Sequence, residues 1–255
     1  MSRRRFVVVL LLGGRLLLAA ADPPPPPKSL DPAEAARQGR ALVADILAQT
    51  PTENLTNTGW LKIRDGKGKR TEFPVRFEIL AGAAEWSSRY ETLPATNGTS
   101  AEQLAVFHAG SQSNRYELSL DAGTNQRTLG PRTITPWMPF AGSDFWVADL
   151  GLDFFHWPEQ RILKSELRRS RSCQVLESVN PQPAPAAYSR VVSWIDSETS
   201  AILQAQAYDA AGKLLKEFDP KKVKKVNGQW QLEEMEIDNF QTGSRTRIEF
   251  SFDQK

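Results

Sequence analysis

Cysteine is almost absent from this sequence, since Cys173 is the only thiol among 255 residues. No internal disulfide can form, so the fold must be held together by its own core. Histidine is nearly as rare, and neither His108 nor His156 lies at metal-ligand spacing from another histidine or the cysteine. The sequence therefore argues against a zinc centre. We expect Cys173, which lies in a strand-like run, to be a buried structural thiol.

Motifs for nucleophilic catalysis and phosphate binding are missing as well. The sequence contains no G-x-S-x-G, no H-E-x-x-H and no glycine-rich loop followed by Lys and Ser or Thr. It therefore offers no positive evidence for an enzyme. We predict a protein that is not an enzyme and that needs neither a metal nor a cofactor.

Long hydrophobic runs are absent too. The apolar stretch near the N-terminus is interrupted at residues 13–15 and is shorter than the roughly 20 residues that a spanning helix needs. It follows three arginines and ends in three alanines at 19–21, which is typical of a secretory signal peptide. We expect residues 1–21 to be cleaved near Ala21 and the proline-rich residues 22–29 to form an extended tether. An uncleaved membrane anchor is the alternative.

The net charge of +2 depends on the N-terminal segment. Without residues 1–21 the chain carries 28 basic and 30 acidic residues, which removes the main electrostatic support for a nucleic-acid partner. Two basic clusters remain, "RRSRS" at 168–172 and "KKVKK" at 221–225. They indicate either solvated strand faces protected by lysine against edge pairing, or a docking surface for an acidic partner or an anionic lipid head group.

One helix is expected at the start of the folded part. Asp31 can cap it, Pro32 suits its first position, and Leu42, Ile46 and Leu47 recur at helical spacing. The pattern predicts an amphipathic helix over 31–49.

Alternating apolar and polar residues follow from residue 54 to the C-terminus. A hairpin is predicted around "DGKGK" at 65–69, and turn signals separate further short strands. We predict one domain over 30–255, mainly β with α. Its core would be a curved antiparallel sheet or half-open β-barrel of about 10–11 strands, covered by the N-terminal helix and a short mid-chain helical lid.

The aromatic mid-chain stretch at 137–158 also contains several acids. The spacing of Asp144, Asp149, Asp153 and Glu159 does not match a calcium loop. Asp144 follows Gly142 and Ser143, so we interpret it as the cap of a short helix, with the acids capping and solvating that helix. A catalytic role for paired carboxylates is the alternative.

Three stretches carry recurrent motifs: "GSDFWVADLGLDFF" at 142–155, W-I-D-x-E-T with Y-D-x-x-G-K at 188–218, and W-x-x-x-x-M-x-x-x-N at 226–250. They resemble the LolA-like outer-membrane lipoprotein-sorting proteins of bacteria. The resemblance covers roughly residues 54–252. The matching residues are Gly142, Ser143, Asp144, Phe145, Asp149, Leu150, Trp194, Ile195, Asp196, Glu198, Thr199, Tyr208, Asp209, Gly212, Lys213, Trp230, Met235 and Asn239.

This resemblance implies a periplasmic half-open barrel whose apolar cavity takes the acyl chains of a lipoprotein or lipid. Inner-membrane donor and outer-membrane acceptor proteins would be its partners, and the carrier would be a monomer. Alternation along the strands and the aromatic stretch supply the candidate residues of the cavity and lid, namely Leu42, Ile46, Trp60, Phe77, Trp86, Phe107, Trp137, Met138, Phe140, Phe145, Trp146, Phe154 and Phe155.

Two other hypotheses stay open. The first is a cell-envelope structural or assembly module in which the aromatic stretch is ordinary core or a protein interface. The second is a hydrolase that uses Asp144 or Asp149 together with His156. A cavity filled by its own side chains would favour the first.

Overall fold

Twelve strands, the long helix α1 (Pro32–Leu47) and three short helical elements make up the part of the chain that the structure describes. The computed structural model describes residues 30–93, 101–121, 134–226 and 229–251, so the predicted signal peptide and tether lie outside it. The strands are β1 (Leu55–Arg64), β2 (Arg70–Leu80), β3 (Trp86–Thr92), β4 (Ala101–Ala109), β5 (Gln112–Asp121), β6 (Glu159–Arg168), β7 (Arg171–Val179), β8 (Arg190–Asp196), β9 (Ile202–Tyr208), β10 (Leu214–Val226), β11 (Gln229–Asn239) and β12 (Ser244–Ser251).

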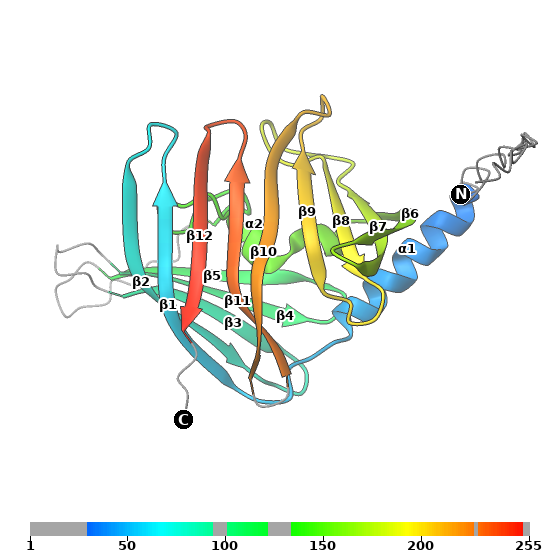
Figure 1. Ribbon diagram of the computed structural model, residues 1–255. Helices are drawn as coiled ribbons and strands as arrows, with labels where there is room; N and C mark the ends of the chain where they lie inside the picture. The colour runs from blue at the N-terminus through cyan, green and yellow to red at the C-terminus, as the bar shows by residue number, and fades with distance from the viewer. Residues whose placement is uncertain (1–29, 94–100, 122–133, 227–228, 252–255) are drawn as a thin grey trace, which may run out of the picture.

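All twelve strands belong to one antiparallel sheet, in the order β5-β4-β3-β2-β1-β12-β11-β10-β9-β8-β7-β6. Two meanders, β1 to β5 and β6 to β12, join where β1 pairs with β12. The sheet curves so strongly that β3 to β5 lie behind β10 to β12 (Figure 1). Since β5 and β6 are the two ends of the order, the barrel is half open, and the predicted fold class is confirmed.

Alternation places one face of each strand inside the curve. In β1 the side chains of Asn57 and Leu61 are buried, whereas Thr58 and Trp60 between them are exposed. Leu61 belongs to the same hydrophobic cluster as Phe145 of the mid-chain segment, so this buried face is the concave one. The period of two residues thus decides which side chains can reach the interior.

Helix α1 (Pro32–Leu47) begins as the sequence predicts and ends two residues earlier. The carboxylate of Asp31 accepts a hydrogen bond from Ala33 N at 3.0 Å, which caps the first turn. The helix packs against β6, one end of the sheet order, so closely that a Cβ added at Gly39 would lie 2.5 Å from Arg161 Cα. Only glycine permits this approach, and the helix thereby covers the exposed edge of β6.

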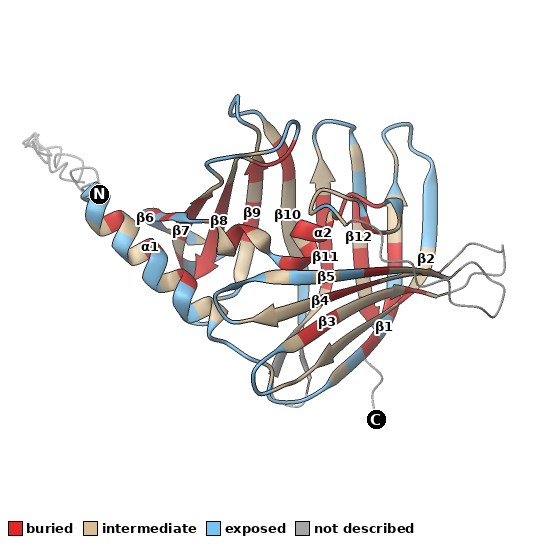
Figure 2. Ribbon diagram, turned by 180° about the vertical axis from the view of Figure 1, so that it is seen from behind, coloured by how far each residue is buried: buried red, intermediate tan, exposed pale blue. Residues whose placement is uncertain are grey.

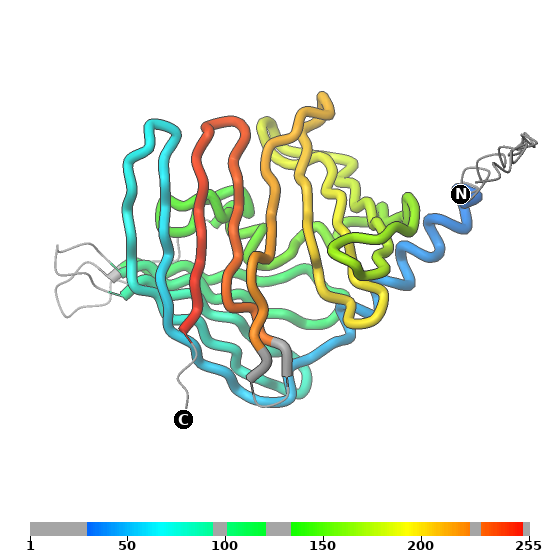
Figure 3. The backbone as a smooth tube through the Cα atoms, in the orientation of Figure 1, coloured from blue at the N-terminus to red at the C-terminus, as the bar shows by residue number. Residues whose placement is uncertain are grey.

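The mid-chain segment, residues 134–158, runs through the concave side of the sheet (Figure 3). It contains the 3-10 turns η1 (Phe140–Gly142) and η2 (Asp153–His156), with the short helix α2 (Val147–Gly151) between them. Four of the five residues of α2 are buried, and Figure 2 shows this helix inside the curve of the sheet. The segment is therefore an internal wall of the fold.

The strand count exceeds the expected 10–11 by at least one, and the β6–β7 hairpin shows why boundaries were hard to predict. Arg169 and Ser170 form its turn with φ values of 51° and 62°, a left-handed conformation that usually signals glycine or asparagine. Strand β10 is the opposite case, because it continues through Pro220 at a register shift. The first place is a turn without the usual turn residues, and the second is a strand that continues through one.

Candidate functional site

A cavity of about 690 Å³ lies on the concave side of the sheet, and we call it the main cavity. Helix α1, the mid-chain segment and strands β3, β9, β10 and β11 all contribute to its wall. The volume is within the range of small-molecule binding sites in proteins. The apolar lining includes Ile46, Phe145, Leu150, Phe155, Phe218 and Met235.

A second hollow of about 840 Å³ adjoins the main cavity beneath β1, β2 and β3. Phe77, Ile79 and Phe250 contribute apolar side chains to it, and residues 50–54 bring polar groups. The two spaces share Tyr90, Gln231, Leu232 and Met235 as lining residues. The concave face therefore offers two adjoining compartments separated by a few side chains.

Asp144 fixes the middle of the mid-chain segment to β11 and β12. Its carboxylate is buried and accepts hydrogen bonds from Asn239 Nδ2 at 3.0 Å, Ser244 Oγ at 2.5 Å and Thr246 Oγ1 at 2.8 Å. The predicted helix-capping role of Asp144 is wrong, because α2 begins three residues later, at Val147. The carboxylate instead satisfies donors of two strands that are remote in sequence, which no local pattern reveals.

Asp149 holds α2 against β10 through a buried polar cluster. Its carboxylate accepts from Trp146 N at 2.8 Å and from the Tyr188 hydroxyl at 2.9 Å, and Lys216 Nζ lies 3.4 Å away. Lys216 is only 1% exposed, donates to the Asp144 carbonyl at 2.6 Å and sits 3.5 Å from the centroid of the Trp146 ring. Burial lowers the pKa of Lys216 and raises that of Tyr188.

Asp153 attaches the end of the segment to β5. The Tyr116 hydroxyl donates to this carboxylate, and so does Asn114 Nδ2 at 3.0 Å, while the same amide donates to the Gly151 carbonyl at 2.7 Å. Burial raises the pKa of the Asp153 carboxyl. The three aspartates thus anchor one segment to three parts of the sheet.

These contacts give the acids of the aromatic stretch a structural role. The prediction that they are solvated is wrong for Asp144, which is buried, and Asp153 has its partners inside the fold. Among the described residues no group of three or more His, Cys, Asp or Glu side chains could hold a metal ion. Cys173 is buried, as expected, and burial raises the pKa of its thiol.

The predicted lining residues have different surroundings in the structure. Ile46, Phe145 and Phe155 line the main cavity, and Phe77 lines the second hollow. Phe154 lines a void of about 30 Å³ beside Lys216. The remaining inward residues are packed in the two hydrophobic clusters around the mid-chain segment and include Leu42, Trp137, Met138, Phe140 and Trp146.

Three predicted lining residues have other surroundings. Trp60 lies on the outer face of β1 and is 46% exposed, while Phe107 lies under the guanidinium of Arg115 on β5. Trp86 stacks on His108, with ring centroids 3.9 Å apart. For Trp60 and Phe107 the expected alternation is out of register by one residue, which moves a side chain to the other face of the sheet. Trp86 shares its face of β3 with Tyr90, which lines both compartments, but it is not among their lining residues.

His108 provides a test of acid sensitivity. Burial lowers its pKa from 6.5 to about 4. Between these values the unfolded chain binds a proton that the native chain does not, so the free energy of unfolding falls as pH drops from 6.5 to 4. Thermal melts at pH values between 6.5 and 4 should therefore show a smaller fall in Tm for His108→Gln than for the unmodified protein. Other titrating groups contribute equally to both proteins, so they cancel in the comparison. An equal fall in Tm in the two proteins would contradict the lowered pKa of His108.

No helix within the described ranges is both long and apolar enough to cross a membrane. This finding concerns the helices at 32–47 and 147–151 and the short turns beside them.

Three solved bacterial structures share this architecture. A domain described as an outer membrane lipoprotein-sorting protein domain from Vibrio parahaemolyticus has 19% identity and a TM-score of 0.70, with 85% of this chain and 92% of that chain covered. A DUF1329 family protein from Desulfovibrio piger has 22% identity, a TM-score of 0.66 and coverages of 85% and 91%. A LolA superfamily protein from Nitrosomonas europaea has 15% identity, a TM-score of 0.56 and coverages of 86% and 92%.

The chain has the LolA-like fold. At identities of 15–22% the similarity establishes the architecture and leaves the function to be argued from the site. A protein-family model described as "Uncharacterized protein" matches residues 130–254. A search of curated proteins finds no match.

The LolA-like motifs of the sequence have visible structural roles. Asp196 of W-I-D-x-E-T accepts hydrogen bonds from Thr199 N at 2.8 Å and Glu198 N at 3.0 Å, which shapes the β8–β9 turn. Asp209 of Y-D-x-x-G-K does the same for the β9–β10 turn, and Asn239 donates to the buried Asp144. The motifs therefore stabilise turns and the inner wall.

Several residues of the site were missed by reasoning from the sequence. Lys216 carries no local signal, because lysine is rarely buried unless it is paired. Tyr188 begins a strand-like stretch of the sequence but lies two residues before β8, so alternation does not indicate where its ring points. Phe218 and Leu232 lie on β10 and β11, where alternation is interrupted by the register shifts near Pro220.

Proposed function

We propose that the protein is an exported periplasmic carrier that holds acyl chains of a lipid or lipoprotein in the main cavity. The observation that carries this proposal is the apolar cavity of about 690 Å³ between the concave face and the mid-chain segment. An apolar space of this size suits a flexible hydrocarbon chain better than a polar substrate. The LolA-like fold agrees with a carrier, and lipoprotein sorting or lipid transport would require a donor and an acceptor at the two membranes.

The energetics of such binding need no charged anchor. Each methylene group moved from water into an apolar environment contributes about 0.8 kcal/mol, so a dozen of them contribute on the order of 10 kcal/mol before the entropic losses of binding. The mid-chain segment forms a fixed inner wall, because its three aspartates are bonded to the sheet. Helix α1 also contributes to the wall of the cavity, through Ile46.

The first test is whether the protein carries lipid. Native mass spectrometry and organic extraction of the purified, exported protein should reveal a bound amphiphile, and the delipidated protein should bind a fluorescent fatty acid. A folded protein that carries no lipid and binds no probe would contradict the proposal and favour an envelope assembly module.

The second test fills the cavity. Leu232 lies in the wall between the two compartments, so Leu232→Trp should occupy space in both and weaken fatty-acid binding by about tenfold or more. Leu167 is 78% exposed at the end of β6, so Leu167→Trp is the matched control and should bind normally. Titration with the fluorescent fatty acid measures both effects. Unchanged affinity in the folded Leu232→Trp protein would place the ligand elsewhere.

A further inference from the structure

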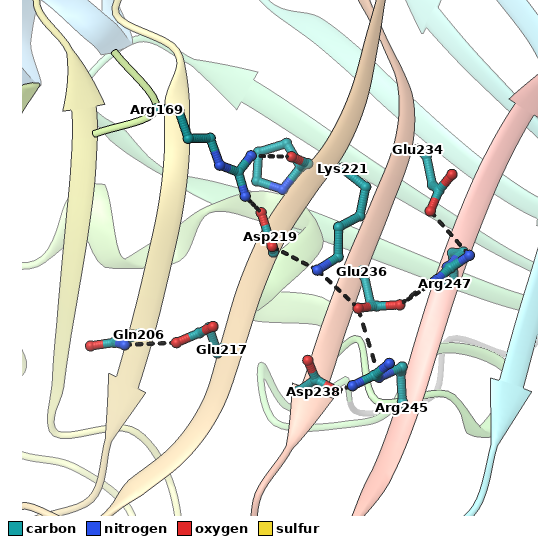
Figure 4. A network of polar contacts seen from close by, with 11 residues as sticks. Arg169, Gln206, Glu217, Asp219, Lys221, Glu234, Glu236, Asp238, Arg245 and Arg247 are labelled. Carbon is teal, nitrogen blue, oxygen red and sulfur yellow. Dashed lines mark hydrogen bonds and ion pairs between the residues drawn. The ribbon is translucent and has the colours of Figure 1, made fainter. Parts of the chain in front are cut away.

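The two basic clusters of the sequence meet at the edge of the main cavity. Arg169, in the β6–β7 turn, donates from Nη1 to the Pro220 carbonyl at 2.7 Å and from Nη2 to the Asp219 carboxylate (Figure 4). Lys221 and Lys222 follow directly on β10. The β6–β7 turn is thus bonded to β10 at its register shift, although β8 and β9 lie between β7 and β10 in the sheet order.

The charged side chains that line the main cavity are almost all basic. They are Arg169, Arg171, Lys221 and Lys222, together with one acid, Asp149. Asp149 lies on the inner wall, where the Tyr188 hydroxyl donates to it and Lys216 pairs with it. The charged groups at the cavity edge itself are therefore basic, and each of them pairs with an acid.

The carboxylates that hold these cations lie beneath them. The four basic side chains are 33–64% exposed, whereas their partners Asp219, Asp196, Glu236 and Glu234 are 1–14% exposed. Figure 4 shows Arg169 and Lys221 joined through Asp219 and Glu236 in one network. An approaching anion would meet the nitrogen donors before it meets the acids. Glu198, which is 85% exposed beside Arg171, is the exception, so the two lysines are the better groups to test.

We propose that the cavity takes an anionic phospholipid, with its acyl chains in the apolar space and its phosphate-bearing head group at this cationic edge. The inference rests on the proposed carrier function and names the chemical class of its cargo. A basic residue near an anionic lipid contributes about fivefold in affinity, so two lysines contribute roughly 30-fold. The charge complementarity also explains why both clusters lie at the cavity edge.

The variant that tests this edge is Lys221→Gln/Lys222→Gln. It leaves each buried acid with a partner, since Asp219 keeps Arg169, and both Glu236 and Glu234 keep Arg247. The matched control is Lys62→Gln/Lys164→Gln, which removes two lysines paired on the surface with Glu249 and Glu166. Both double variants lose two charges, and every acid that loses a lysine in the edge variant keeps an arginine, so we expect both to fold.

The probes are dioleoyl phosphatidylglycerol and dioleoyl phosphatidylcholine, whose acyl chains are identical. Both are delivered in a nonionic detergent and followed by displacement of an uncharged fluorescent lipid. The unmodified protein and the control should bind the anionic lipid about 30-fold or more tightly than the zwitterionic one at low salt. The edge variant should lose roughly 30-fold in affinity for phosphatidylglycerol and keep its affinity for phosphatidylcholine. In 1 M salt, where the Debye length is about 3 Å, the preference should shrink.

The outcomes separate this inference from the carrier function. Equal affinity for the two lipids, or an unchanged preference in the edge variant, overturns the head-group proposal while chain binding stands. Failure of either lipid to bind the folded protein overturns the carrier function itself.

Discussion

Asp144→Ala is expected to lower the free energy of unfolding by about 3 kcal/mol or more. The substitution removes the acceptor of three donors, the buried Thr246 Oγ1 and the partly buried Asn239 Nδ2 and Ser244 Oγ, and it opens a gap between the mid-chain segment and β12. For a chain of this size the loss corresponds to a fall in Tm of roughly 6–12 °C. Chemical denaturation and calorimetry measure the two quantities.

The control for this substitution is Asp45→Ala. Asp45 is an exposed acid on α1, so its removal should change the free energy of unfolding by no more than about 0.5 kcal/mol. If Asp144→Ala is as mild as Asp45→Ala, the carboxylate does not anchor the segment.

Lys216→Met is expected to destabilise the protein by about 3 kcal/mol, although methionine preserves much of the side-chain volume. The change removes the cation that lies 3.4 Å from Asp149 Oδ2 and 3.5 Å from the Trp146 ring, and it leaves the partly buried Asp149 without its counter-charge. Limited proteolysis should then cut within residues 134–158 sooner than in the unmodified protein. Denaturation and the cleavage pattern provide the readouts.

A double-mutant cycle with Asp149→Asn separates pairing from packing. If Lys216 acts through Asp149, the two substitutions together cost less than the sum of the single effects. A neutral or stabilising Lys216→Met would instead show that hydrophobic packing replaces this ion pair without loss, as happens for some buried pairs.

The aromatic residues of the mid-chain segment belong to the core and in part to the wall of the main cavity. Phe140 and Val147 are 1% exposed and belong to the hydrophobic core, while Phe145 and Phe155 lie in the core and also line the main cavity. The segment therefore packs against the core with some of its side chains and faces the space proposed for the ligand with others. Its acids fasten that wall to the sheet.

The sequence by itself determined the elements whose signals are local. The cap at Asp31, the period of α1 and the alternation of β1 and β2 around the turn at Asp65 depend on neighbours within a few residues, and all three are confirmed. The half-open antiparallel barrel also follows from this pattern of short strands together with the resemblance to LolA-like proteins.

Only the tertiary structure decided what depends on distant partners. Asp144 meets donors about a hundred residues away, Lys216 is buried because Asp149 and Trp146 face it, and Arg169 reaches Pro220 across the strands between them. Each interaction depends on the register and the curvature of the sheet, and these result from many small interactions along the whole chain. For this reason the sequence predicts the barrel, whereas only the folded chain shows which residues form the wall and the edge of its cavity.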